Sequence, residues 1–173
     1  MTIAPPQPSE FNEYYARYIA TVPSSGPLAH LNAQFPVFHK LAQLSDKDAG
    51  SRYAEGKWSV KEVVGHMADV ERLFSYRLLH VARGDQAALP GMDEKVWSAV
   101  APHDRRRMAE LVKELIAVRH ATIGLVESLD EAAVARAGVA SGFPITARAL
   151  CWILPGHTQH HLNVLRDRYK VPV

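Results

Sequence analysis

Apolar residues recur at helical spacing along most of the chain, and this periodicity strongly favours an all-α architecture. Residues at i, i+3, i+4 and i+7 share one face of a helix. The pattern is clearest over residues 11–22, 28–44, 60–82, 105–129 and 146–169. Strand signals are sparse, because the chain has no sustained period-two alternation and no Asn-Gly or Asp-Gly turn. We therefore expect four main helices and a short extra helix at the N-terminus.

A capping box marks the clearest helix start. Ser59 and Glu62 give the pattern Ser-x-x-Glu directly before the apolar run of residues 60–82. Gly84 closes this helix. The segments 84–100 and 138–144 contain turn residues and are expected to be loops, the first with room for one helical turn.

Four amphipathic helices are most simply buried as a four-helix bundle within one domain of residues 1–173. Pro36 should kink the second pattern, and Pro155-Gly156 should kink or break the last one. The connection of residues 84–104 exceeds the roughly 2–8 residues usual in bundles, which allows a crossover without fixing the topology. Residues 1–10 are expected to be flexible or irregular.

Composition excludes several classes of protein. The chain has 173 residues, of which 47% are hydrophobic and 22% charged, as is ordinary for a globular domain. A lone cysteine, Cys151, excludes an internal disulfide framework. No apolar run approaches the ~20 residues of a membrane span. The first ten residues lack the features of a signal peptide, so we expect a cytoplasmic protein with no membrane partner.

The charge pattern argues against nucleic-acid binding. The formal net charge is +2, and the basic run Arg105-Arg106-Arg107 is best explained as a solvated face. The chain also lacks a P-loop, a GxGxxG motif and a GxSxG motif. We therefore expect a small-molecule partner and no nucleic acid.

The chain has nine histidines, and His66 is one that lies within an apolar helical pattern. It lies three residues after Val63 and four before Val70, so it shares their apolar helix face. Taken alone, such a residue is more often a hydrogen-bonded core histidine than a ligand. Glu62 and Asp69, at i−4 and i+3, are the candidate partners.

The last helical segment carries two more inward histidines. His157 and His161 are spaced at i and i+4 on the apolar face, which lets both imidazoles approach one metal ion. The intervening residues supply no glutamate base of the His-Glu-x-x-His kind. His160 is rotated away by about 100° from His161 and is expected at the edge of the face.

A bundle core would let His66 meet His157 and His161. Three imidazoles with one remaining coordination position describe a catalytic rather than a structural metal site. A divalent ion there would lower the pKa of water or polarise a substrate atom, and a thiolate substrate would suit zinc.

The sequence around these residues resembles the DinB/YfiT-like superfamily over about residues 10–170. The segments that carry the resemblance are 56–72 (GKWSVKEVVGHMADVER), 76–78 (YRL), 82–85 (ARGD), 89–93 (LPGMD) and 156–162 (GHTQHHL). The resemblance implies an up-up-down-down four-helix bundle, often a homodimer. It also implies one metal ion, usually nickel or zinc, held by His66, His157 and His161. Relatives include metal-dependent hydrolases and thiol-dependent transferases and isomerases that use mycothiol or bacillithiol.

Other side chains receive secondary assignments. Asp69, Glu62 and His160 are candidates for supporting the metal ligands, since ligating histidines usually donate their second N–H to such a group. Arg77, and less directly Arg83, could contact an anionic substrate. Trp58 should pack at the helix start, and Cys151 should be a small buried hydrophobe. Five histidines lack metal-ligand spacing and are unassigned: His30, His39, His80, His103 and His120.

Three functional hypotheses remain open at this point. The first is an enzyme that activates water or a low-molecular-weight thiol for transfer or hydrolysis on a small molecule. The second is a stress-response protein of the same family that binds metal or ligand without turnover. The third is a structural bundle whose histidines are hydrogen-bonded core residues.

Overall fold

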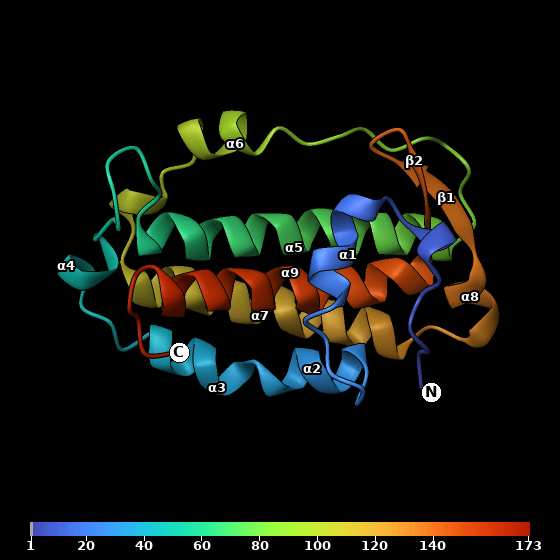
Figure 1. Cartoon of the computed structure of the whole chain (residues 1–173), viewed down its shortest axis with the longest axis horizontal. Helices are drawn as coiled ribbons and strands as arrows, with labels where there is room; N and C mark the ends of the chain where they lie inside the picture. The colour runs from blue at the N-terminus through green and yellow to red at the C-terminus, as the bar shows by residue number, and fades with distance from the viewer. Residues whose placement is uncertain (1) are drawn as a thin grey trace.

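A computed structural model describes residues 2–173, and Met1 lies outside the described residues. The chain folds as a bundle of long helices, as Figure 1 shows. The first helical arm is split, and the other three are continuous. The bundle consists of α2 (Pro27–Ala33) with α3 (Phe35–Leu41), α5 (Val60–Ala82), α7 (Met108–Glu127) and α9 (Ala147–Asp167). The expected all-α four-helix bundle is confirmed.

Shorter elements connect and cover the bundle. They are 3₁₀ turns at Pro8–Glu10, Glu13–Tyr15 and His103–Arg105, the helices α1 (Ala16–Ile19), α4 (Asp46–Ala49), α6 (Glu94–Val100) and α8 (Glu131–Ala135), and the strands β1 (Ala137–Ala140) and β2 (Phe143–Thr146). Residues 2–7 have no regular secondary structure, and Ile3 among them is buried against the core. No helix of residues 2–173 has the length and hydropathy needed to span a membrane.

The helix directions follow from two buried apolar clusters at opposite ends of the bundle. One cluster joins the end of α3, the starts of α5 and α7, and the end of α9. The other joins α2, the ends of α5 and α7, and the start of α9. Hence α5 and α7 run parallel, while the α2–α3 arm and α9 run the opposite way (Figure 1).

This order differs from the up-up-down-down arrangement that the family resemblance implied. A single long crossover, residues 83–107, returns from the end of α5 to the start of α7 and carries α6 over one side of the bundle (Figure 1). We call this segment the strap. The other connections join helix ends that already lie together, so the chain contains one crossover rather than two.

Pro36 and Pro155 lie within helices, and each lacks the N–H group with which other residues bond to the preceding turn. Pro36 falls in the first turn of α3, where it is tolerated, and the expected kink is a break at Gln34 between α2 and α3. Pro155 is accommodated inside α9, which continues unbroken through it. The N-terminal helix is shorter than residues 11–22, because only Ala16–Ile19 is α-helical.

The capping box is formed as predicted. The Ser59 hydroxyl accepts from the Glu62 N–H at 3.1 Å, and the Glu62 carboxylate accepts from the Ser59 N–H at 2.7 Å. These two bonds satisfy backbone donors that the first turn of α5 leaves free. The first turn is therefore fixed directly before the residues that face the core.

The segment expected as a loop at residues 138–144 is instead a β-hairpin. Strands β1 and β2 pair antiparallel around Ser141 and Gly142, whose φ values are 56° and 83°. Two consecutive left-handed residues match the tight turn that suits twisted hairpins. Leu89 of the strap bonds to β1 through its N–H to the Val139 carbonyl at 2.9 Å. The hairpin thereby anchors the strap to the end of the bundle.

The strap carries more helix than expected. Its α6 spans Glu94–Val100, capped by the Asp93 side chain, where one helical turn was predicted. The following basic run is ion-paired at the surface, with Arg106 against Glu114 and Arg107 against Glu110. This agrees with its interpretation as a solvated face.

Candidate metal centre

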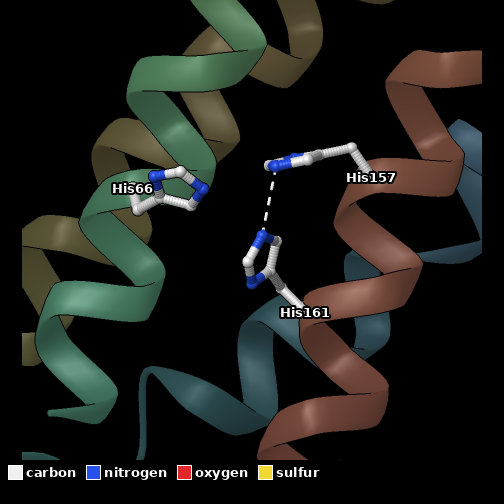
Figure 2. Close-up of side chains that lie close together, drawn as sticks. All are labelled: His66, His157 and His161. Carbon is white, nitrogen blue, oxygen red and sulfur yellow. Dashed lines mark hydrogen bonds between the residues drawn. The ribbon is translucent and has the colours of Figure 1, made fainter. Parts of the chain in front are cut away.

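Three histidines from two helices converge in the bundle (Figure 2). His66 extends from α5, and His157 and His161 extend from adjacent turns of α9. One ring nitrogen from each residue lies within 4.8 Å of the other two. The convergence was predicted from helical facing, and the packing of α5 against α9 brings it about.

Burial keeps these imidazoles in their neutral form. Desolvation lowers the pKa of His66 to about 4, and the neighbouring His103 lowers it further while Asp69 opposes the shift. Desolvation also lowers the pKa values of His157 and His161 well below the usual range, and the other site imidazoles add to both effects. At neutral pH all three rings therefore offer an unprotonated lone pair.

The ring contacts suit a metal better than they suit a hydrogen-bonded core. Among the described residues, the trio's ring nitrogens make one hydrogen bond, between the two Nε2 atoms of His157 and His161 at 3.1 Å. In this bond one Nε2 donates and the other accepts. The lone pair of the donating ring and the lone pair of His66 therefore receive no hydrogen bond from the described part of the chain. Two ligands of a zinc ion with bonds of about 2.1 Å at tetrahedral angles lie roughly 3.4 Å apart. The donor set and spacing therefore fit a divalent ion.

Aromatic side chains surround the trio. The Trp58 ring lies 4.7 Å from that of His66, between ring centroids. The Tyr18 and Phe74 rings lie 5.3 Å and 5.8 Å from the His157 ring. These contacts fix the imidazoles and limit their exposure to water. The predicted packing role of Trp58 thus places it directly beside a candidate ligand.

Two pockets reach the trio from different sides. The first has a volume of about 220 Å³ and includes His66 and His157 in its wall. The second, of about 450 Å³, includes His161 and Trp58. Glu94 of α6 borders both. His66 and His157 are therefore buried and His161 is half-buried, yet the trio is accessible to a small molecule, as a catalytic site requires.

The three residues named as supporting groups take up other positions. The Asp69 carboxylate contacts His103 at 3.2 Å and Arg72 at 3.5 Å, rather than His66. Glu62 completes the capping box and pairs with Arg52 at 2.5 Å. Among described contacts, neither carboxylate bonds to the trio.

His160 lies beside the trio and not within it. Its ring is 5.2 Å from that of His161 and 5.3 Å from that of Tyr18. Burial lowers its pKa, and the nearby Arg17 lowers it further. The expected edge position on α9 is confirmed.

His103, unassigned from sequence, forms a buried contact behind the site. Its ring packs on Gly65, where an added Cβ would stand 2.3 Å from the imidazole. It comes from the strap, so it joins the strap to α5 one residue before His66. The sequence signal was a glycine inside an otherwise strong helix, which often marks a close packing contact.

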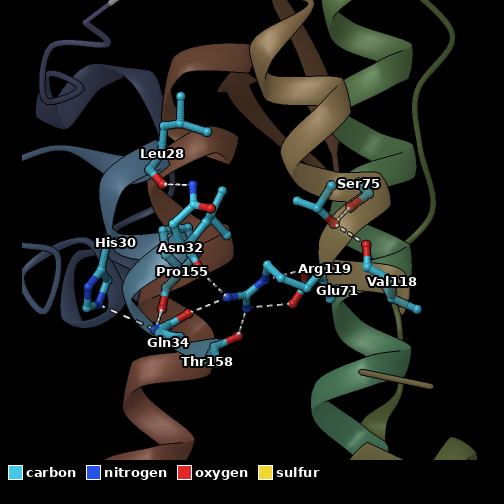
Figure 3. A network of polar contacts seen from close by, with 12 residues as sticks. Leu28, His30, Asn32, Gln34, Glu71, Ser75, Val118, Arg119, Pro155 and Thr158 are labelled. Atoms are coloured by element: carbon cyan, nitrogen blue, oxygen red, sulfur yellow. Dashed lines mark hydrogen bonds and ion pairs between the residues drawn. The ribbon is translucent and has the colours of Figure 1, made fainter. Parts of the chain in front are cut away.

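A buried polar network behind the trio was also missed (Figure 3). The Arg119 guanidinium of α7 bonds both carboxylate oxygens of Glu71 on α5, at 2.7 Å and 2.8 Å. It also donates to the Gln34 side chain at 2.6 Å and to the Thr158 hydroxyl at 3.0 Å. Thr158 follows His157 directly, so one buried cation ties α9, beside the site, to the other helices of the bundle.

Of three further residues singled out in the sequence, only Arg77 borders the first pocket, and Arg83 and Cys151 lie elsewhere. Arg77 is 2% exposed and forms part of the wall of the first pocket. Arg83 is exposed at the end of α5, away from the lining of that pocket. Cys151 is fully buried in α9, and burial raises the pKa of its thiol to about 12. It is the small buried hydrophobe that the sequence predicted.

Known proteins share this fold and sequence pattern. A protein of Oceanobacillus iheyensis, provisionally named metal-dependent hydrolase OB0413, is 26% identical over 125 residues, which cover 69% of each chain. The structure of YfiT from Bacillus subtilis superimposes with a TM-score of 0.72 at 19% identity, over 95% of this chain and 91% of that one. YfiT is described as a probable metal-dependent hydrolase with an unusual four-helix bundle topology. The family model of the DinB superfamily matches residues 32–165, and this chain belongs to that superfamily.

Proposed function

We propose that this protein is a metal-dependent enzyme acting on a small molecule, with a divalent ion held by His66, His157 and His161. The observation that carries the proposal is the convergence of three neutral imidazoles within 4.8 Å beside two pockets. The naming of its relatives as metal-dependent hydrolases supports the same conclusion.

The ligand set favours a catalytic ion over a structural one. Structural zinc sites have four protein ligands, whereas catalytic sites keep three and leave a position for water or substrate. Imidazole ligands suit zinc and nickel, the two ions that we propose. When bound, such an ion supplies Lewis-acid chemistry that polarises a substrate oxygen and lowers the pKa of water or a thiol.

The chain's own residues would orient a substrate and exclude water from the imidazoles. Trp58 and Phe74 cover the imidazoles and limit water around them. Tyr18 belongs to the wall of the first pocket, and burial raises the pKa of its hydroxyl, so this group stays protonated and can donate a hydrogen bond to a substrate oxygen. Glu94 is the carboxylate in the lining of that pocket and could accept a proton.

Metal analysis of the untagged protein tests the site. We expect stoichiometric zinc or nickel in the unmodified chain and at least about tenfold weaker binding in His161→Ala. His39→Ala is the matched control, because His39 is exposed on α3, outside the site. Full metal content in His161→Ala would refute the ligand assignment, and no divalent ion bound at micromolar concentrations would support the structural-bundle hypothesis.

Turnover separates an enzyme from a binding protein. The metal-loaded protein should hydrolyse members of a panel of small esters and amides, or transfer mycothiol or bacillithiol to electrophilic acceptors. His161→Ala should abolish either activity, while His39→Ala should preserve it. A metal with no exchangeable position and no turnover would favour the non-catalytic alternative. The homodimer and the cytoplasmic location stay predictions.

A further inference from the structure

Arg77 is a buried cation with neutral partners. Its Nη2 donates to the Pro90 carbonyl at 2.8 Å and to the Ser141 hydroxyl at 3.0 Å. Its Nε is buried and has no hydrogen-bond partner. Among the described residues, no carboxylate forms an ion pair with it. Arg119 is equally buried but bonds Glu71 through two nitrogens.

A buried charge without a counter-charge is costly, and proteins usually pair it. The two neutral contacts of Arg77 fasten the strap and the hairpin turn, but they leave its charge uncompensated. Since Arg77 lies in the wall of a pocket, the missing partner can come from a bound molecule. A carboxylate is suited to a guanidinium because the two planar groups pair through charge-assisted hydrogen bonds.

The same pocket joins Arg77 to the histidine trio. His66, Val70, Phe74 and Arg77 follow one another at i, i+4, i+8 and i+11, which gives one face of α5, and all four line the pocket. Arg77 lies three turns beyond His66, about 16 Å along the helix axis. Both residues belong to the lining of the same pocket. A molecule in this pocket can therefore hold a charged end at Arg77 and a reacting group near His66.

The middle of the pocket is aromatic and apolar. Tyr15 and Phe74 pack edge-to-face with ring centroids 6.0 Å apart, and Met92 and Val70 also contribute to the wall. Glu94 is the carboxylate in the lining, and it is exposed, so it can remain in solvent. At about 220 Å³ the pocket is smaller than the usual sites of drug-sized ligands.

We propose that Arg77 anchors the carboxylate of a small organic acid whose apolar or aromatic middle fills this pocket. The reaction of such an acid at the far end rests on the proposed metal function. The anchor itself does not, because it can be measured on the metal-free protein.

The direct test is a comparison of acids with their neutral amides. The untagged full chain is freed of metal with a chelator and titrated at pH 8 with acetate, butanoate and phenylacetate, and with the three corresponding amides. Calorimetry gives the affinities, and the ¹⁵Nε–¹H resonance of Arg77 reports contact. We expect at least one acid to bind about tenfold or more tightly than its amide and to shift this resonance. Equal affinities, or no saturable acid binding, would overturn the proposal.

Variants separate an anchor from a structural arginine. Arg77→Gln should lose the preference for acid over amide, whereas Arg83→Gln, an exposed neighbour on the same helix end, should keep it. Ser141→Ala removes one neutral partner of Arg77 and should keep or increase the preference. A folded Arg77→Gln that retains the preference contradicts the proposal. If this variant does not fold, the Arg77 resonance in the unmodified chain decides.

Repeating the titration with zinc distinguishes the two proposals. Acid binding that requires zinc and survives Arg77→Gln would refute the anchor and leave the metal site standing. Arg77-dependent acid binding in a chain that binds no divalent ion would confirm the anchor and refute the metal function.

Discussion

Gly156 lies so close to Tyr18 that a Cβ atom at position 156 would stand 2.3 Å from the Tyr18 carbonyl oxygen. The Thr21 hydroxyl bridges the two segments, because it lies within hydrogen-bonding distance of both the Tyr18 carbonyl, at 2.7 Å, and the Gly156 carbonyl, at 3.3 Å. The missing side chain therefore lets α1 rest directly on α9, one residue before His157. This contact places the Tyr18 ring against a candidate metal ligand.

Gly156→Ala should consequently destabilise the fold, although alanine is normally the better helix former. We expect a loss of about 1–3 kcal/mol in the free energy of unfolding, because α1 must move away. Gly124→Ala is the matched control, since its added Cβ meets nothing within 4 Å on α7. That change should stabilise by up to about 1 kcal/mol. Urea unfolding measures both, and equal stabilisation would show that the α1 contact is dispensable.

The stability of the metal-free protein should fall as pH decreases from about 6.5 toward 4. In the unfolded chain histidines bind protons near pH 6.5, whereas in the fold the pKa of His66 is about 4 and those of His157 and His161 are also well below normal. The unfolded state therefore gains protons first. Each such histidine contributes a slope of roughly 1.4 kcal/mol per pH unit in this window.

Urea unfolding at successive pH values measures that slope. Replacing His66 by Asn should reduce it by about one histidine's share, while the same change at the exposed His39 should leave it nearly intact. Unfolding free energies that stay level between pH 6.5 and 4 would contradict neutral burial of the trio.

The histidine trio could be found from sequence because its signal is local. Helical spacing alone puts His66, His157 and His161 on apolar faces, and bundle packing leaves few ways for those faces to avoid one another. The same reasoning found the capping box at Ser59, whose hydrogen bonds span only three residues.

Features that depend on distant partners were missed. Arg119 and Glu71 occupy positions on apolar helix faces, four residues after Leu115 and Met67 respectively. A charged residue is nevertheless expected at the surface unless its partner is known. Each of the two supplies the other's counter-charge across two helices, and this pairing offsets the cost of burying them. Positive φ angles at Ser141 and Gly142 form the hairpin, and the Ser-Gly dipeptide there was its available signal.

Breaking the Arg119–Glu71 pair should be among the most damaging single changes in the chain. Arg119→Met leaves the Glu71 carboxylate buried and uncompensated, which typically costs about 3–5 kcal/mol. The double variant Arg119→Met/Glu71→Leu removes both charges and should recover much of that loss. A double-mutant cycle from urea unfolding gives the coupling, and purely additive losses would contradict it.

Cys151 should resist thiol reagents in the native state. It is fully buried, and its raised pKa of about 12 leaves almost no thiolate at neutral pH. A chromogenic disulfide reagent should react only after denaturation, so that labelling follows the unfolded fraction. Rapid labelling of the folded protein would mean that α9 opens locally near the site.

The strap is attached to the bundle at both ends, through Leu89 on the hairpin and His103 on Gly65, but its middle forms one border of the two pockets beside the trio. The contacts that hold the strap to the bundle are therefore separate from the stretch that borders these pockets. Substitutions between these two attachments should therefore alter the pocket walls at little cost to folding. We expect divergence among relatives, and successful redesign, to concentrate there.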